Sequence, residues 1–115
     1  MELPTLHGLD VDRVLDTARA PVLLVVTRSG CGACRGVKAA FAALALAPTD
    51  PLATLLAYEV DATDAPALVE ELGIFHLPAL WLHVAGEPVV EVPAATTPAR
   101  LEAALRAALA EALAG

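Results

Sequence analysis

The sequence alternates between short, uninterrupted apolar runs and segments in which apolar residues recur every three or four positions. The clearest run, residues 21–27, is rich in Val and Leu, which is typical of a central strand buried on both faces. Residues 55–60 predict a second strand, and residues 79–84 and 89–92 predict two more that pair antiparallel. The segment Gly86-Glu87-Pro88 is expected to form the turn between these last two.

Helical spacing predicts helices over residues 9–16 and 33–47. Pro66 in a first turn and Gly73 as a C-terminal cap predict a short helix over residues 66–72, and Thr97-Pro98 is a cap and first-turn proline that opens a final helix. The final helix has leucines at steps of four, which predict one buried stripe: Leu101, Leu105, Leu109 and Leu113. The order of elements is helix, strand, helix, strand, helix, strand, strand, helix. This order predicts an α/β fold with a mostly parallel sheet covered on both faces, and the 115-residue length fits a single domain over residues 1–115.

The composition narrows the class of protein. The chain is 57% hydrophobic but only 3% aromatic, so we expect an aliphatic core. The longest apolar run, residues 39–48, is roughly half of the 18 or so residues that a membrane-spanning helix needs. Residues 1–4 do not resemble a secretory signal, so we expect a soluble, cytoplasmic protein without a membrane partner. The net charge of −7 and the scattered basic residues argue against nucleic-acid binding.

The two cysteines, Cys31 and Cys34, open the predicted second helix. A cysteine at a helix start faces free backbone N–H groups and the positive end of the helix dipole, which favour its thiolate. Cys34 lies one turn further on the same side, close enough to form a disulfide with Cys31. The spacing therefore predicts that Cys31 attacks a disulfide as a thiolate and that Cys34 resolves the resulting mixed disulfide.

The residues around the pair fit this chemistry. Gly32 and Ala33 are small and leave the approach to Cys31 open, while Arg35 and Lys38 add positive charge within the next turn. A zinc site is the main alternative, because a Cys-x-x-Cys pair can supply two of four zinc ligands. Only three histidines could complete such a site and none has paired spacing, so no metal site is predicted: His7, His76 and His83.

Beyond the cysteines, the sequence resembles the thioredoxin family over roughly residues 9–113. The likeness includes the strand before Cys31, the segment Val60-Asp61-Ala62-Thr63, and the turn at Gly86-Glu87. Residues 72–80, Leu-Gly-Ile-Phe-His-Leu-Pro-Ala-Leu, are similar to the family's Tyr-Gly-Ile/Val-x-x-Ile-Pro-Thr-Leu pattern. The resemblance implies a thioredoxin-like fold, with a four-stranded mixed sheet flanked by helices on both faces.

The resemblance also implies which residues meet a substrate. Pro78 corresponds to the family's cis-proline opposite the dithiol, with an ordinary trans proline at the start of an edge strand as the alternative. The backbone of Leu77 is then free to pair with an extended substrate segment. Together with Gly30, Gly32 and Ala33, these residues are the expected substrate-binding surface, and Arg35 and His76 are expected modulators.

Several positions depart from the family pattern. The Trp that usually precedes the first cysteine is Gly30, and the usual Gly-Pro between the cysteines is Gly32-Ala33. The family's buried acid aligns with Val25 and its companion lysine with Ala57, so Cys34 must lose its proton by another route. We hypothesise that water or His76 substitutes; alternatively, His76 is a solvated loop residue.

The leading hypothesis is a cytosolic thiol–disulfide oxidoreductase that passes two electrons from a reductase or small thiol to protein disulfides. It would act as a monomer and need no cofactor besides the redox-active disulfide Cys31–Cys34. A second hypothesis is a redox sensor or protein-binding module with little turnover, because the buried acid, its companion lysine and the tryptophan before the first cysteine are all missing. Trp81 lies on a predicted strand away from the dithiol and is expected to be a packing residue. A metal or iron–sulfur carrier is a third.

Overall fold

Strand β1 (Val22–Thr27) lies inside a four-stranded sheet with the order β2-β1-β3-β4 in the computed structural model, which describes residues 1–114. Strand β2 (Leu56–Asp61) runs parallel to β1, whereas β3 (Ala79–Val84) runs antiparallel to β1 and pairs antiparallel with β4 (Glu87–Val92). All six residues of β1 are buried, as the apolar run predicts. The four-stranded mixed sheet confirms the predicted fold class.

The expectation of a mostly parallel sheet is wrong, because only the β1–β2 pair is parallel. The connection from β2 to β3 explains this. Helix α3 (Pro66–Leu72) has seven residues and is about 10 Å long, whereas a six-residue strand spans about 20 Å. The helix is therefore too short to carry the chain back along the strand, and β3 starts near the end of the sheet where β2 stops.

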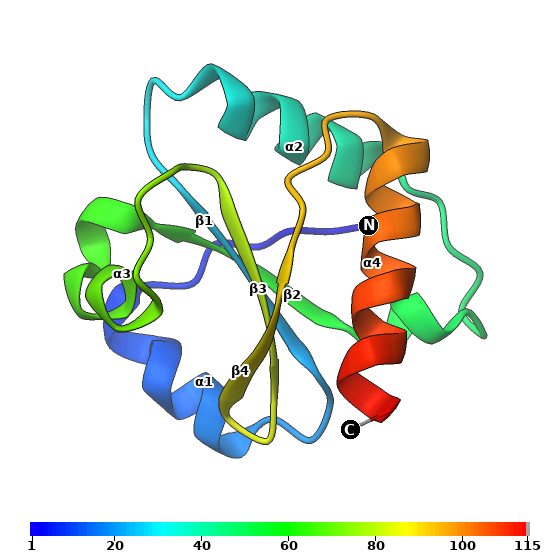
Figure 1. Cartoon of the computed structure of the whole chain (residues 1–115), viewed down its shortest axis with the longest axis horizontal. Coiled ribbons are helices and arrows are strands. Elements are labelled where there is room, and N and C mark those ends of the chain that lie inside the picture. The colour runs from blue at the N-terminus through cyan, green and yellow to red at the C-terminus, as the bar shows by residue number, and fades with distance from the viewer. Residues whose placement is uncertain (115) are drawn as a thin grey trace.

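Helices cover both faces of the sheet (Figure 1). Helices α2 (Gly32–Ala43) and α4 (Pro98–Ala114) cover one face, over a core that includes Leu23, Val25, Val37, Phe41, Leu80, Leu101 and Leu105. Helices α1 (Val11–Thr17) and α3 cover the other, over Val11, Leu15, Val22, Leu24, Val26, Val60 and Leu68. Short 3-10 turns occupy Gly8–Asp10, Pro51–Thr54 and Ala62–Asp64.

Two predicted boundaries and one predicted core residue are corrected. Helix α2 ends at Ala43 rather than at residue 47, because Leu44 turns to extended backbone and buries its side chain in the core. Strand β4 begins earlier than predicted, because Ala85 and Gly86 form a two-residue turn with φ of 53° and 82°. Leu113 does not join the buried stripe and is 64% exposed, since the last turn of α4 extends past the core.

The N-terminal segment adds a pairing that the sequence does not predict. Thr5 forms a parallel bridge with Glu59 on β2. The N–H of Leu6 donates to the Glu59 carbonyl, and the N–H of Glu59 donates to the Pro4 carbonyl, each over 2.8 Å. The outer edge of β2 is therefore hydrogen-bonded at Glu59. Among the helices of residues 1–114, none combines the length and apolar character needed to cross a membrane.

Candidate active site

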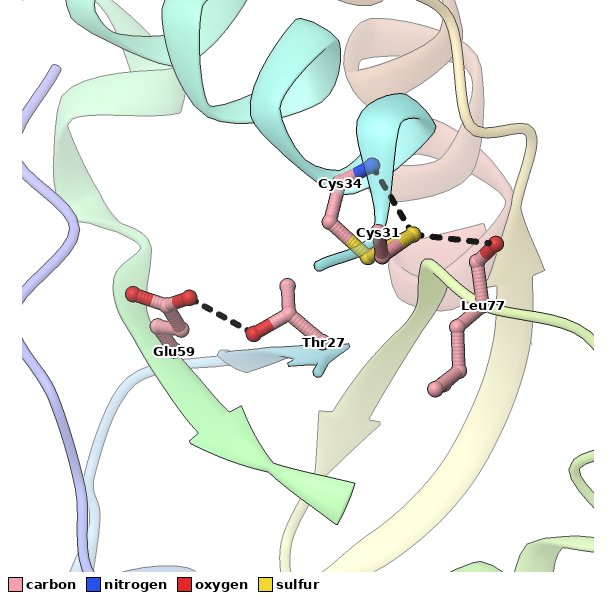
Figure 2. The surroundings of a disulfide bond; sticks show 5 residues. All are labelled: Thr27, Cys31, Cys34, Glu59 and Leu77. Atoms are coloured by element: carbon pink, nitrogen blue, oxygen red, sulfur yellow. Dashed lines mark hydrogen bonds between the residues drawn. A yellow bond between two sulfur atoms is a disulfide. The ribbon is translucent and has the colours of Figure 1, made fainter. Parts of the chain in front are cut away.

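Cys31 is the N-cap residue of α2, with extended backbone at φ −87° and ψ 110°. Its Sγ is joined to Sγ of Cys34 in a disulfide, with the two Cα atoms 5.2 Å apart. The backbone N–H of Cys34 donates to Sγ of Cys31 over 3.2 Å (Figure 2). In the reduced protein, this amide and the helix dipole would stabilise a negative charge on Cys31.

The two sulfurs differ in access to solvent. Cys31 is half-buried at the mouth of the helix, whereas Cys34 is 3% exposed and faces the core side of α2. A substrate disulfide can therefore reach Cys31 more easily than Cys34. The arrangement suits an exchange in which Cys31 forms the mixed disulfide and Cys34 attacks from behind.

The backbone around Cys31 leaves its approach open. Gly30 has a φ of +82°, a conformation that favours glycine, and a side chain added there would meet nothing within 4 Å. Gly32 and Ala33 lie exposed in the first turn of α2. Gly30 therefore precedes the dithiol, and Gly32 and Ala33 lie between its two cysteines on the exposed side of the first turn.

Leu77 and Pro78 lie opposite the dithiol, just before β3. The Leu77 carbonyl oxygen is 3.8 Å from Sγ of Cys31, and the Leu77–Pro78 peptide bond is cis. Both residues are half-buried. The loop before them exposes His76 and, at 91%, the ring of Phe75.

A cavity of about 510 Å³ lies on the α3 side of this loop. Its lining is mainly apolar and includes Pro66, Val69, Ile74, Phe75 and Leu77. Neither cysteine lines this cavity, but Leu77, whose carbonyl oxygen lies near Sγ of Cys31, connects it to the dithiol. It could receive an apolar side chain of a molecule whose disulfide has reached Cys31.

A second cavity, of about 430 Å³, lies on the other side of the dithiol. Cys31 and Cys34 line it together with the basic residues Arg28, Arg35 and Lys38. Arg35, predicted as a modulator, therefore lies beside the pair, whereas His76 is exposed and is not among the residues that line this cavity.

The floor of this second cavity holds a polar pair that was not predicted from the sequence. The Thr27 hydroxyl donates to Oε2 of Glu59 over 2.6 Å, and Thr27 is only 4% exposed (Figure 2). Nζ of Lys38, on α2, lies 3.1 Å from Oε1 of Glu59. The signal that could have found Glu59 is its position two residues after Ala57, which places both on the face of β2 beneath α2.

The positions that depart from the family pattern are apolar in the structure. Val25 is fully buried and Ala57 is 7% exposed, both in the cluster beneath α2 and α4. In the β1–β2 register, Glu59 is the partner of Val25. An acid is therefore present one strand away from Val25.

Trp81 and His83 both lie on β3. Trp81 is half-buried against the α1 and α3 side of the sheet, which agrees with the expected packing role. Its buried indole Nε1 has no hydrogen-bond partner among residues 1–114. His83 is 2% exposed on the same strand. Within residues 1–114, no group of three or more His, Cys, Asp or Glu side chains is arranged to hold a metal ion.

Comparison with known proteins gives a consistent result. The family model described as Thioredoxin matches residues 5–107. Among solved structures, the Malassezia sympodialis thioredoxin Mala s 13 matches with a TM-score of 0.74 and 19% identity, over 93% of this chain and 90% of that one. A mutant thioredoxin from Halobacterium salinarum NRC-1 matches with a TM-score of 0.69 and 21% identity, over 95% and 88%. These two likenesses show the fold, and no curated protein sequence gives a match.

Proposed function

Because the chain belongs to the thioredoxin family and holds a Cys31–Cys34 disulfide, we propose that it is a thiol–disulfide oxidoreductase that reduces protein disulfides in the cytosol. The observation that carries this proposal is the asymmetry of the pair. Sγ of Cys31 can be reached by a substrate and accepts a hydrogen bond from the backbone N–H of Cys34. Cys34 itself is buried next to it.

The reduced protein would act in two steps. The Cys31 thiolate attacks one sulfur of the substrate disulfide, a Cys31–substrate S–S bond forms, and the other substrate sulfur leaves as a thiolate. Cys34 then loses its proton and attacks Sγ of Cys31, which releases the second substrate sulfur and forms the Cys31–Cys34 disulfide. Two electrons pass to the substrate, and a small thiol or a reductase restores the dithiol.

The substrate surface in this proposal consists of Gly30, Gly32 and Ala33 on one side and Leu77 and Pro78 on the other. The open approach at Gly30 and the Leu77 carbonyl near Cys31 support it. An extended substrate segment would pair with the backbone of Leu77.

We also propose that the protein acts as a single domain over residues 1–115 and as a monomer, with the disulfide as its only redox group. The cytosolic setting is favoured because a dithiol that donates electrons needs a reducing compartment to be recharged.

A redox sensor or binding module with little turnover is the second candidate. The apolar residues Val25 and Ala57 favour it, because neither can exchange a proton with Cys34. A metal or iron–sulfur carrier would need ligands beyond the two cysteines, and the described residues offer no such group.

Reduction of insulin disulfides by the wild type, Cys31→Ser and Cys34→Ser separates these candidates. We expect turnover in the wild type, none in Cys31→Ser, and a trapped mixed disulfide in Cys34→Ser. A dithiol that cycles with small thiols but does not reduce insulin would favour the sensor.

The reduction potential of the pair against glutathione tests the direction of electron flow. A value of about −270 mV supports a reductant. A value of about −120 mV is typical of an oxidant and would overturn the proposed flow of electrons from this protein to its substrate.

A further inference from the structure

The second step of the proposed reaction needs a group that accepts the proton of Cys34. The Cys34 side chain is 3% exposed, so bulk water reaches it poorly. The 430 Å³ cavity that both cysteines line provides the route by which a proton could leave. The acceptor should therefore be a basic group on the wall of this cavity.

The cavity wall holds five charged side chains, from three parts of the fold. Arg28 follows β1, Arg35 and Lys38 lie on α2, and Glu59 and Asp61 lie on β2. The two arginines remain protonated at any relevant pH and accept no proton. Lys38 is engaged as the cation of an ion pair with Glu59. Two carboxylates remain as candidates.

Asp61 is the weaker candidate. Its Oδ1 accepts hydrogen bonds from the backbone N–H of Thr63 at 2.8 Å and from the Thr63 hydroxyl at 2.7 Å. These bonds lower the pKa of Asp61 below its ordinary value, which makes it a poorer base. Both bonds hold the same carboxylate oxygen against Thr63 in the turn after β2.

Glu59 lines the same cavity as Cys34 and is held firmly in place there. Its side chain is 14% exposed, and each carboxylate oxygen has one partner, Thr27 on β1 and Lys38 on α2. Its backbone is held on both sides, by β1 and by the N-terminal segment. Figure 2 shows Thr27 between Glu59 and the disulfide. Little conformational freedom remains to be lost when the carboxylate acts.

The geometry points to Glu59 as the group that accepts the Cys34 proton, through water in the shared cavity, with Thr27 and Lys38 as positioning residues. This inference rests on the proposed function. As Cys34 Sγ attacks Sγ of Cys31, its proton passes to the Glu59 carboxylate. The Cys31–substrate bond breaks, and its electron pair leaves on the substrate sulfur. The protonated Glu59 then returns its proton to the leaving thiolate or to water.

The cavity can hold the water that this step needs. A water molecule requires about 10–15 Å³ and two to four polar partners, and the cavity offers far more volume together with charged walls. The Thr27 hydroxyl can accept one hydrogen bond while it donates to Glu59, so it can also orient such a water.

The test separates the two chemical steps with 5,5′-dithiobis(2-nitrobenzoate), which releases one coloured thiolate at each step. In stopped-flow measurements on the reduced protein, the first phase depends on reagent concentration and the second does not. We expect Glu59→Gln to slow the second phase at least tenfold at pH 6–7 and to leave the first phase within twofold. Asp61→Asn is the matched control, because it removes a like charge from the same wall, and both phases should stay within twofold.

The pH profile distinguishes proton transfer from a structural effect. With Glu59 as base, the second phase should change little between pH 6 and 8. In Glu59→Gln it should rise about tenfold per pH unit, because only thiol that is already ionised can attack. Glu59→Asp should recover part of the rate. Thermal unfolding followed by circular dichroism checks that each variant folds.

Two results would overturn the inference: equal second phases in Glu59→Gln and Asp61→Asn, or a pH slope that Glu59→Gln leaves unchanged. Should Glu59→Gln fail to fold, Thr27→Val and Lys38→Met loosen the carboxylate without removing it. An unaltered second phase in both would then count against the inference. A missing first phase in the wild type would instead refute the proposed function.

Discussion

The backbone amide of Cys34 donates to Sγ of Cys31 over 3.2 Å, so the second cysteine of the pair solvates the sulfur of the first. This contact exists because Cys31 is the N-cap of α2, where backbone amides of the first turn lack helical partners. The two thiols of the reduced protein should therefore differ in reactivity.

Alkylation of the reduced protein should show that difference. At pH 7, iodoacetamide should label Cys31 at least tenfold faster than Cys34, because Cys31 is stabilised as thiolate and is reachable, whereas Cys34 is buried. Mass spectrometry of peptides after timed quenching measures the ratio. Equal labelling of the two cysteines would contradict the assigned roles.

The charges beside the dithiol predict a substrate preference. Arg28 and Arg35 are exposed and line the cavity at Cys31, although the chain as a whole carries a net charge of −7. The double variant Arg28→Ala, Arg35→Ala should reduce an acidic peptide disulfide several-fold more slowly and change little with a neutral peptide.

Ionic strength provides the check on that preference. The difference between the two peptides should shrink in 0.5 M salt, because exposed charges are screened there. Arg13→Ala is the matched control, since Arg13 pairs with Asp10 near the start of α1 and does not line the cavity at the dithiol. A preference for acidic peptides that survives in the double variant would rule out this origin.

The buried side chain of His83 should make the folded protein less stable in acid. Burial lowers the pKa of His83 below its ordinary 6.5, although a hydrogen bond at the Trp81 carbonyl and the charges of Glu71 and Glu87 oppose the shift. The unfolded chain therefore takes up a proton more readily than the folded one. Stability is full above pH 6.5 and falls as the pH drops below it, by at most about 1.4 kcal/mol per pH unit for one proton.

Urea unfolding at pH 7.5 and pH 5.5 measures this contribution. His83→Gln should reduce the loss of unfolding free energy between the two pH values. His76→Ala, at an exposed position, should leave that loss unchanged. If the wild type and His83→Gln lose equal stability, another group controls the acid sensitivity.

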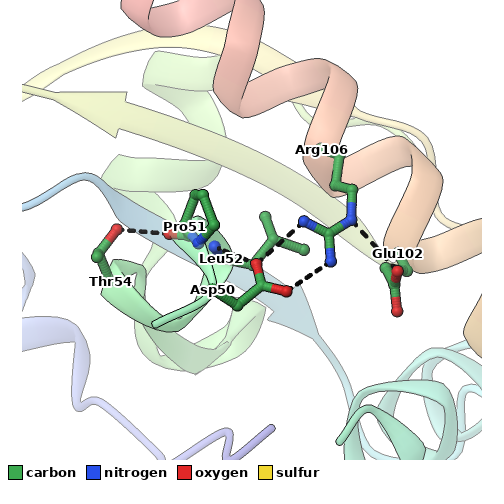
Figure 3. A network of polar contacts seen from close by, with 6 residues as sticks. All are labelled: Asp50, Pro51, Leu52, Thr54, Glu102 and Arg106. Atoms are coloured by element: carbon green, nitrogen blue, oxygen red, sulfur yellow. Dashed lines mark hydrogen bonds and ion pairs between the residues drawn. The ribbon is translucent and has the colours of Figure 1, made fainter. Parts of the chain in front are cut away.

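Arg106 on α4 anchors the segment between α2 and β2 to the rest of the fold. Its Nη1 and Nη2 donate to the two carboxylate oxygens of Asp50 at 3.0 and 2.7 Å, and its Nε donates to Glu102 (Figure 3). The arginine lowers the pKa of Asp50, which also accepts the N–H of Leu52. The side chain of Leu52 is fully buried in the core.

Arg106→Met should lower the thermal midpoint by a few degrees at most, because the pair is partly solvated. Since the pKa of Asp50 is lowered from 3.8, the stabilisation is present above that pH and is lost as the pH falls below it. Wild type and variant should thus converge in acid and in high salt. Arg106→Lys should retain part of the effect, and Arg100→Met on the same helix is the control.

Local patterns in the sequence predicted the elements whose signals are strong. The Val and Leu run gave β1, and the i, i+4 leucines gave α4 except at Leu113, which lies beyond the core. The spacing of Cys31 and Cys34 gave the dithiol at a helix start. These features depend on neighbours a few residues apart, which is why they can be predicted from one sequence.

The missed features depend on contacts between distant segments. Nothing near Thr5 signals that it will pair with Glu59, because the pairing is set by where β2 lies in the folded sheet. In the sequence, Glu59 is simply one polar position in a strand that is expected to be half-buried. Its place beneath the dithiol follows from the β1–β2 register, which pairs it with Val25.

The two outer strands of the sheet limit pairing with strands of other molecules in different ways. Beside β2, the N-terminal segment already occupies backbone groups at Glu59. On β4, Pro88 has no N–H to offer, and the register with β3 shifts between Leu82 and His83. The hydrogen bonds at Glu59 and the proline on β4 each interrupt an edge on which a strand of another molecule could pair. Both features disfavour edge-to-edge growth into amyloid-like ribbons.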